Sequence, residues 1–121
     1  MRLYDLPIDG NVYTACCGLH ALEQLQNQHG SLDVFEKKLI GDAKENMSLD
    51  IATVRNTARL FLEDGAKASG SELTKKAIES IVDNAGGVYD LAANLYVIFS
   101  KSIASNVDEK NEESQIGRAH V

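Results

Sequence analysis

The chain has no tryptophan, one proline and only two cysteines among its 121 residues. The cysteines are neighbours, Cys16 and Cys17, and adjacent residues are poorly placed to form a disulfide with each other. A secreted domain held together by disulfides would show several spaced cysteines, so this pattern favours a reduced, cytoplasmic setting. The scarcity of proline suits a helical protein with short connections.

The chain also lacks long apolar runs and an excess of basic residues. The N-terminus has no apolar segment typical of a signal peptide, and the apolar stretch 91–99 is interrupted by Asn94 and too short to span a bilayer. Twelve Lys and Arg face 18 Asp and Glu, which gives a net charge of −6. Because nucleic-acid affinity depends on cations that neutralise phosphates, we do not expect a nucleic-acid partner. The lack of a long apolar segment likewise argues against a membrane partner.

The length and composition predict one domain, over residues 1–105. From residue 106 onward the composition turns acidic and almost without apolar residues, so we expect a disordered acidic tail over 106–121. Residues 115–121 continue no pattern and are compatible with a sequence added for expression.

The clearest local signal is a β-hairpin at the N-terminus. Residues 3–8 and 12–15 contain β-favouring side chains and flank the segment Asp9-Gly10-Asn11. These turn residues tolerate positive φ, so the two segments can pair as short antiparallel strands.

Beyond the hairpin, apolar residues at helical spacing predict a mainly α fold with about five helices. Ser31, Ser48 and either Ser71 or Thr74 are good N-caps, and the glycine-containing stretch 65–70 is expected to interrupt the helices. The predicted helices cover 18–29, 32–40, 49–64, 72–84 and 88–104.

Few residues form a pattern with chemical function. Cys16 and His20 are four residues apart and would share one face of a helix, but two ligands do not make a zinc site. A small buried cysteine beside a surface histidine is the favoured interpretation. Cys17 has no electropositive surroundings in the sequence that would activate it as a nucleophile. We therefore predict no catalytic residue, no cofactor and no metal site.

The fifth predicted helix is apolar over more than one stripe, which is typical of a helix that is central to the core or packed against another subunit. Tyr89 and Tyr96 are seven residues apart and lie along one side of it. Core packing is the favoured interpretation of the tyrosines, and a half-hydrated interface is the alternative. The predicted partner-binding surface contains Tyr89, Leu91, Leu95, Tyr96, Ile98 and Phe99.

The order of these motifs is itself informative. It runs from Ile8-Asp9-Gly10-Asn11-Val12-Tyr13 through Leu19-His20-Ala21-Leu22-Glu23-Gln24-Leu25 and His29-Gly30-Ser31-Leu32 to the helix over 48–63 and to Glu72-Leu73-Thr74. Over residues 6–104 this order resembles the small tail assembly chaperones of long-tailed phages and prophages. These motifs are structural rather than chemical.

The resemblance implies a helical protein that associates with itself and binds the tape measure protein and the tail tube protein. It would keep them soluble in the host cytoplasm before the tail polymerises, and it would be absent from the mature virion. The resemblance also implies a longer form made by ribosomal frameshifting. The alternative is a small dimeric helical adaptor or regulator, encoded by a prophage or a bacterium, that acts by binding another protein.

Overall fold

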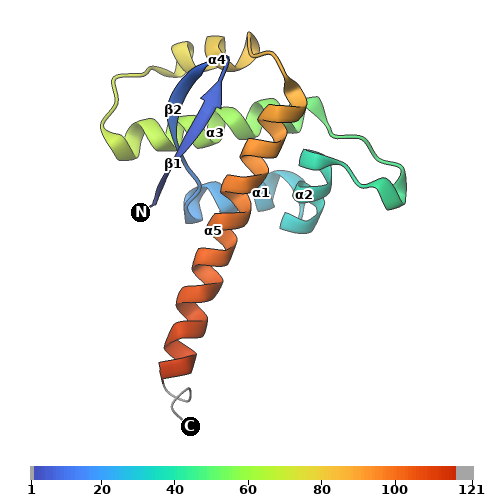
Figure 1. The fold of residues 1–121 in the computed structure, drawn as a ribbon, viewed down its shortest axis with the longest axis vertical. Helices are drawn as coiled ribbons and strands as arrows, with labels where there is room; N and C mark the ends of the chain where they lie inside the picture. Colours follow the sequence, from blue (N-terminus) through green and yellow to red (C-terminus); the bar gives the residue numbers. More distant parts are fainter. Residues whose placement is uncertain (1, 117–121) are drawn as a thin grey trace.

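The computed structural model describes the backbone of residues 2–116 and the side chains of residues 2–104. In this part of the chain a two-stranded antiparallel sheet precedes five α-helices and one 3₁₀ turn, which confirms the predicted mainly α fold (Figure 1). The elements are β1 (Leu3–Ile8), β2 (Asn11–Cys16), α1 (Leu19–His29), α2 (Leu32–Ile40), the 3₁₀ turn Ala43–Glu45, α3 (Ile51–Ser69), α4 (Lys75–Asp83) and α5 (Val88–Ile116).

The hairpin forms at the predicted place. Ile8 pairs with Asn11 next to a two-residue turn in which Asp9 and Gly10 have φ of 51° and 82°. This is the backbone conformation that an Asp-Gly pair favours in a tight hairpin. Leu6 and Ile8 are buried, so one face of β1 contributes to the core.

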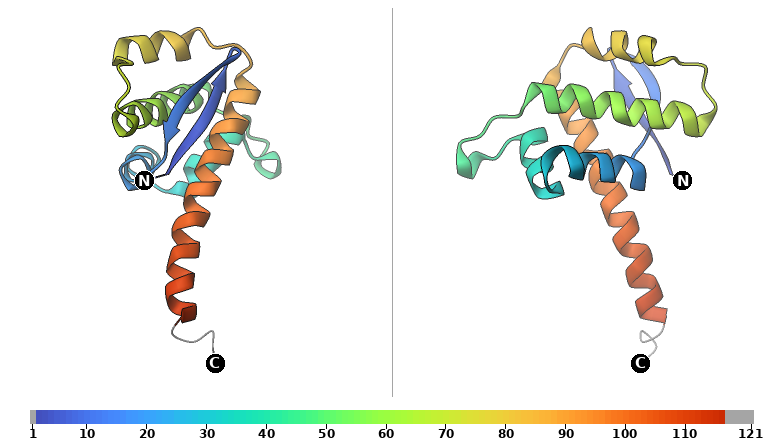
Figure 2. Two further views of the ribbon diagram at one scale, coloured as in Figure 1. Left: turned by 60° about the vertical axis from the view of Figure 1, so that its left-hand side comes forward. Right: turned by 180° about the vertical axis from the view of Figure 1, so that it is seen from behind.

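Helix α3 is the central element. It contacts both strands and each of the other four helices, and it lies between α4 on one side and the α1–α2 pair on the other (Figures 1 and 2). Helix α5 crosses the front of this arrangement and also packs on β1 and α2. The largest fully buried side chains are Phe35, Phe61, Leu6, Leu25, Leu39, Leu62, Ile78 and Leu95.

Helix α3 is longer than the sequence predicted, because Gly65 does not end it. The helix continues to Ser69 and ends at Gly70, whose φ is 70°. Gly65 is buried on the face of α3 that packs on β2, where a Cβ atom would lie 2.7 Å from Ala15 Cα and closer still to the carbonyl oxygen of Thr14. The prediction of a break at 65 is therefore wrong, and this glycine allows the helix and the strand to approach each other closely.

Two helix starts also differ from the prediction. The N-cap of α3 is Asp50 rather than Ser48, since Asp50 Oδ2 accepts hydrogen bonds from Thr53 N at 3.1 Å and from Thr53 Oγ1 at 2.6 Å. Of the two predicted caps for α4, Thr74 is the right one, because its Oγ1 accepts from Ala77 N at 3.1 Å. Helix α4 consequently begins at Lys75 instead of residue 72.

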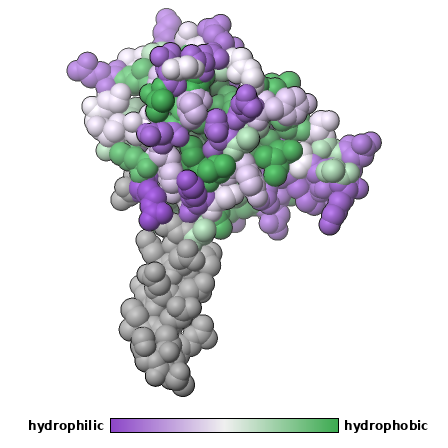
Figure 3. All heavy atoms as spheres, viewed as in Figure 1, coloured by the Kyte–Doolittle hydropathy of each residue, from purple (hydrophilic) through white to green (hydrophobic). Residues whose placement is uncertain are grey.

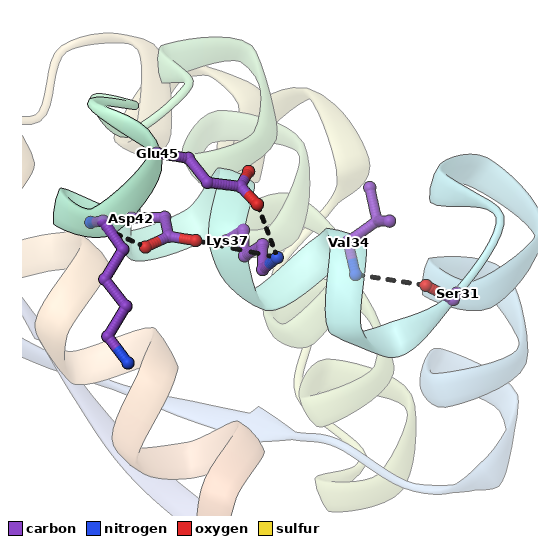
Figure 4. Close-up of polar contacts among 6 residues, drawn as sticks. Ser31, Val34, Lys37, Asp42 and Glu45 are labelled. Atoms are coloured by element: carbon purple, nitrogen blue, oxygen red, sulfur yellow. Dashed lines mark hydrogen bonds and ion pairs between the residues drawn. The ribbon is translucent and has the colours of Figure 1, made fainter.

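Helix α2 has the predicted bounds and a predicted cap. Ser31 Oγ accepts a hydrogen bond from Val34 N at 3.1 Å (Figure 4). Lys37 reaches the loop that follows α2, with its Nζ 3.6 Å from Asp42 Oδ2 and 3.4 Å from Glu45 Oε1. The Glu45 carboxylate raises the pKa of Lys37 through this hydrogen bond. Such exposed pairs add little stability, so the loop depends mainly on its own turn geometry.

Helix α5 continues to Ile116, beyond the predicted end at residue 104. The segment 88–116 contains no glycine or proline, and charged residues can extend a helix that has already formed because propagation is easier than nucleation. The backbone of 106–116 is helical, and residues 117–121 lie outside the described part, so the disordered tail expected over 106–121 stays a prediction. The division of the chain at residue 105 stays a prediction. None of the described helices has the length and apolar character needed to cross a membrane.

We expect Gly65→Ala to lower the free energy of unfolding by about 2 kcal/mol or more, because overpacking against a strand backbone outweighs the better helix propensity of alanine. Gly86→Ala is the matched control, since the nearest atom to its added Cβ, Asp9 Oδ1, is 3.6 Å away. Urea denaturation followed by circular dichroism measures both variants. Equal stabilities of the two variants would contradict the close approach of α3 and β2.

We expect Asp50→Ala to cost about 1 kcal/mol at neutral pH, the usual value of an N-cap. The hydrogen bonds from Thr53 lower the pKa of Asp50 below 3.8, so this stabilisation is present above that pH and is lost as pH falls through the folded-state pKa. Urea denaturation of both proteins over a pH series should show a difference that shrinks on the acid side. A difference independent of pH would contradict a cap based on the charged carboxylate.

Candidate partner-binding surface

The predicted partner-binding residues lie on the first half of α5, and the structure separates them. Tyr89 is 74% exposed, whereas Tyr96 is half-buried and packs on the core. The other four residues are buried, namely Leu91, Leu95, Ile98 and Phe99.

These four buried residues stabilise the domain itself. Phe99 packs edge-on against Phe35 of α2, with ring centroids 5.0 Å apart, and Leu95 is completely inaccessible to solvent. The broad apolar arc of α5 therefore reflects a central helix with neighbours on several sides, which was one of the two interpretations of its pattern. Of the six predicted residues, Tyr89 is the one with most of its side chain exposed to solvent.

A shallow apolar groove lies where α5 begins. We call it the α3–α4–α5 groove; it has a volume of about 320 Å³, and its lining includes Ile51, Val54, Val82, Ala85, Val88 and Leu91. Ile51, in the first turn of α3, is 66% exposed. Tyr89 follows Val88, so the exposed tyrosine lies next in the chain to a residue of the groove wall.

Charged residues stand beside this groove. Arg55 and Asp83 are among its lining residues, and Arg59 donates two hydrogen bonds to Asp83, at 2.9 and 2.8 Å. This two-fold contact joins α3 to the end of α4 and fixes one wall. An apolar floor with a polar rim is typical of protein-binding sites.

The exposed apolar residues of the domain do not form one large patch. On the face seen in Figure 3, apolar areas alternate with hydrophilic ones. Among the described side chains, the large exposed apolar residues are Leu3, Val12, Leu19, Val34, Ile40, Ile51, Tyr89 and Val97. Sequence reasoning missed Ile51 as a surface residue, because its place in the helical period of α3 suggests burial.

A second pocket brings together three residues that the sequence only partly connected. Cys16 ends β2 and does not share a helix with His20, contrary to the prediction. Both nevertheless line one pocket of about 350 Å³ with Asp64 of α3, and His20 Nδ1 lies 3.0 Å from Asp64 Oδ2. No local signal in the sequence connects His20 to Asp64, which is 44 residues away.

This pocket contains a cysteine, a histidine and an aspartate, as a site with a reactive cysteine often does. Its surroundings, however, raise the thiol pKa instead of lowering it. Burial raises the pKa of Cys16, and the charge of Asp64 raises it further. Burial likewise raises the pKa of Cys17 to about 12. Both thiols are protonated at neutral pH, and a thiol rather than a thiolate is a poor nucleophile and metal ligand. Within the described residues, no group of three His, Cys, Asp or Glu side chains is arranged to hold a metal ion.

The remaining histidine of the described part, His29, packs against an aromatic residue of the core. His29 at the end of α1 lies against Phe35, with ring centroids 5.4 Å apart, and burial lowers its pKa below 6.5. The nearby charge of Lys38 acts in the same direction, while Asp50 opposes it.

Comparisons of the chain with protein-family models, with curated proteins and with solved structures found no match. The family resemblance of the sequence motifs therefore stays an expectation. Tyr89, exposed in the first turn of α5, and the α3–α4–α5 groove are the apolar surface features nearest to the predicted partner-binding residues.

We expect both cysteines of the native protein to react slowly with iodoacetamide. A pKa of about 12 in place of 9.0 leaves Cys17 with about a thousandfold less thiolate at any pH below these values, and burial also restricts access. Mass spectrometry of alkylated protein, with and without urea, measures the two rates. Rapid labelling of either cysteine in the folded protein would contradict the described environment.

Proposed function

We propose that this protein is a tail assembly chaperone of a long-tailed phage or prophage. In this role it binds the tape measure protein, the tail tube protein or both in the host cytoplasm. It keeps them soluble until the tail polymerises, and it associates with further copies of itself.

The order of the sequence motifs supports this proposal, as do the structural positions of those motifs. The Ile8–Tyr13 segment forms the hairpin turn, the Leu19–Leu25 segment lies in α1, and Thr74 caps α4. The motifs thus belong to the framework of a helical domain, as a binding protein without chemical activity requires.

The observation that carries the proposal is the exposed apolar surface where α5 begins. A tape measure protein is expected to be a long helix whose apolar residues are uncovered before assembly. An apolar groove binds such a helix by receiving a few of its side chains. Ile51 supplies apolar contact area in the α3–α4–α5 groove. The exposed Tyr89 follows the groove residue Val88 in the chain, and tyrosine is among the residues that contribute most to protein interfaces.

The test is co-expression of this chain with a tape measure protein and a tail tube protein from the same genome, followed by affinity purification. We expect the tape measure protein to be recovered with the wild-type chain. Tyr89→Asp should reduce the recovered amount about tenfold, because a charge replaces an aromatic contact in a desolvated interface. Circular dichroism should show an unchanged helix content, since Tyr89 contributes little to the core.

Leu19→Asp is the matched control. It also replaces an exposed apolar side chain, 76% accessible, by aspartate, but it lies in the first turn of α1. It should leave partner recovery unchanged. If neither tail protein is recovered with the wild-type chain, the chaperone assignment is wrong. A fixed dimer that ignores both tail proteins would instead support the adaptor alternative.

A further inference from the structure

The outer edge of β1 offers unpaired backbone groups to a further strand. In this hairpin the pair Ile8 and Asn11 flanks the two-residue turn and is hydrogen-bonded, so the backbone groups of every second residue point to the partner strand. Leu3, Asp5 and Pro7 belong to the alternate pairs and direct their N–H and C=O groups away from β2. Proline has no N–H, which is why it is tolerated on an edge.

The two edges of the sheet are treated differently by the fold. The outer edge of β2 is covered by α3, because the Thr14 carbonyl oxygen points at Gly65. Among the described residues, no backbone hydrogen bond is made by Leu3, Asp5 or Pro7 on the outer side of β1. The uncovered edge therefore retains two hydrogen-bond donors, the N–H groups of Leu3 and Asp5, and three acceptors, the carbonyl oxygens of Leu3, Asp5 and Pro7.

A groove runs along this edge, between β1 and α5. Its wall on the helix contains Asp90, Asn94, Val97 and Lys101, which follow one another at intervals of four, three and four residues on one stripe of α5. Two adjoining cavities of about 630 and 350 Å³ meet at Asn94. We call this the β1–α5 groove. The groove extends along β1 from the hairpin turn to Leu3.

We propose that the β1–α5 groove binds an extended basic segment of another protein, which adds to β1 as a third strand. Strand addition obtains its affinity from main-chain hydrogen bonds and its specificity from the pockets that receive alternate side chains. Leu3 and Val97, 43% and 46% exposed, both line the smaller cavity and can contact an apolar side chain of the bound segment.

The charges of the groove specify the occupant. Asp9 and Asp90 line the cavity at the hairpin turn, and no cationic side chain is among the described residues that line it. Asp9 already accepts a hydrogen bond from Gly86 N at 3.1 Å, which holds its carboxylate beside the cavity. A lysine or arginine in the bound segment would lie at this end. Lys101 offsets Asp5 at the other end.

The same charges disfavour a second copy of this chain as the occupant. Two β1 strands that pair antiparallel through their outward residues Leu3, Asp5 and Pro7, centred on the middle one, would place Asp5 directly opposite its counterpart, and like charges in that position are destabilising. Each chain also carries a net charge of −6. Among its lining residues this site shares Leu91 alone with the α3–α4–α5 groove, and it does not depend on the proposed function.

The probe is a labelled peptide, Lys-Thr-Val-Thr-Val-Thr, titrated into isotopically labelled protein and followed by nuclear magnetic resonance. We expect shifts confined to β1 and to residues 90–101. At saturation, hydrogen exchange of the Leu3 and Asp5 amides should slow about tenfold or more. No binding, or shifts elsewhere, would overturn the proposal, and slow exchange that depends on protein concentration without peptide would indicate a second copy instead.

Variants of the protein locate the contact. Asp5→Pro removes an outward N–H without removing a bond of the hairpin, and it should weaken peptide binding about tenfold or more. Val12→Pro is the matched control, because it removes an outward N–H from the edge of β2. Asp5→Asn keeps the N–H and removes only the charge, so Asp5→Pro should bind the peptide more weakly than Asp5→Asn does. Equal binding of these two variants would contradict a role of the Asp5 N–H. Equal losses in Asp5→Pro and Val12→Pro would overturn strand addition.

Variants of the peptide give a test that does not depend on protein folding. Methylation of alternate backbone nitrogens, on the side that pairs with β1, should abolish binding to the wild-type protein. Glutamate in place of lysine should weaken binding about tenfold, and this difference should shrink in Asp90→Asn but persist in Asp33→Asn on α2. Undiminished binding of the methylated peptide would overturn the proposal.

Discussion

The close approach of α3 to β2 at Gly65 is the contact on which the rest of the structure depends. The absence of a side chain at this position allows a helix to lie directly against a strand backbone. This places α3 where it contacts both strands and all the other helices, so its apolar face can serve as the common floor of the core. A larger side chain would move the hairpin away from every element that packs on α3.

The second constraint is the position of α5. Helix α5 packs on α3, α2 and β1, and its side chains Leu95, Ile98 and Phe99 are buried in the core. The most apolar segment of the chain is therefore used internally, and the surface available to partners is reduced to the ends and edges of elements. Tyr89 and Ile51 become exposed because each lies in the first turn of its helix, beyond the layer that the neighbouring elements cover.

The same packing makes the small sheet asymmetric. Helix α3 covers the outer edge of β2, whereas the outer edge of β1 lies beside α5. Side chains of α5 and residues of β1 line the cavity between them. Two surfaces of different character result, namely an apolar groove, for which we propose a helical partner, and an open strand edge, for which we propose an extended segment. The two buried cysteines are protonated, so their contribution is to packing.

The local structure follows from the amino-acid sequence alone. Turn chemistry at Asp9 and Gly10, the caps Ser31 and Thr74 and the helical period located the hairpin and the five helices, because these signals act within a few residues. Long-range packing, in contrast, makes Gly65 a contact point rather than a break and buries most of the predicted binding residues in the core. It also placed His20 beside Asp64 and left one strand edge open. These features depend on contacts between residues far apart in the chain, and a local pattern contains no information about which of its faces a distant element will cover.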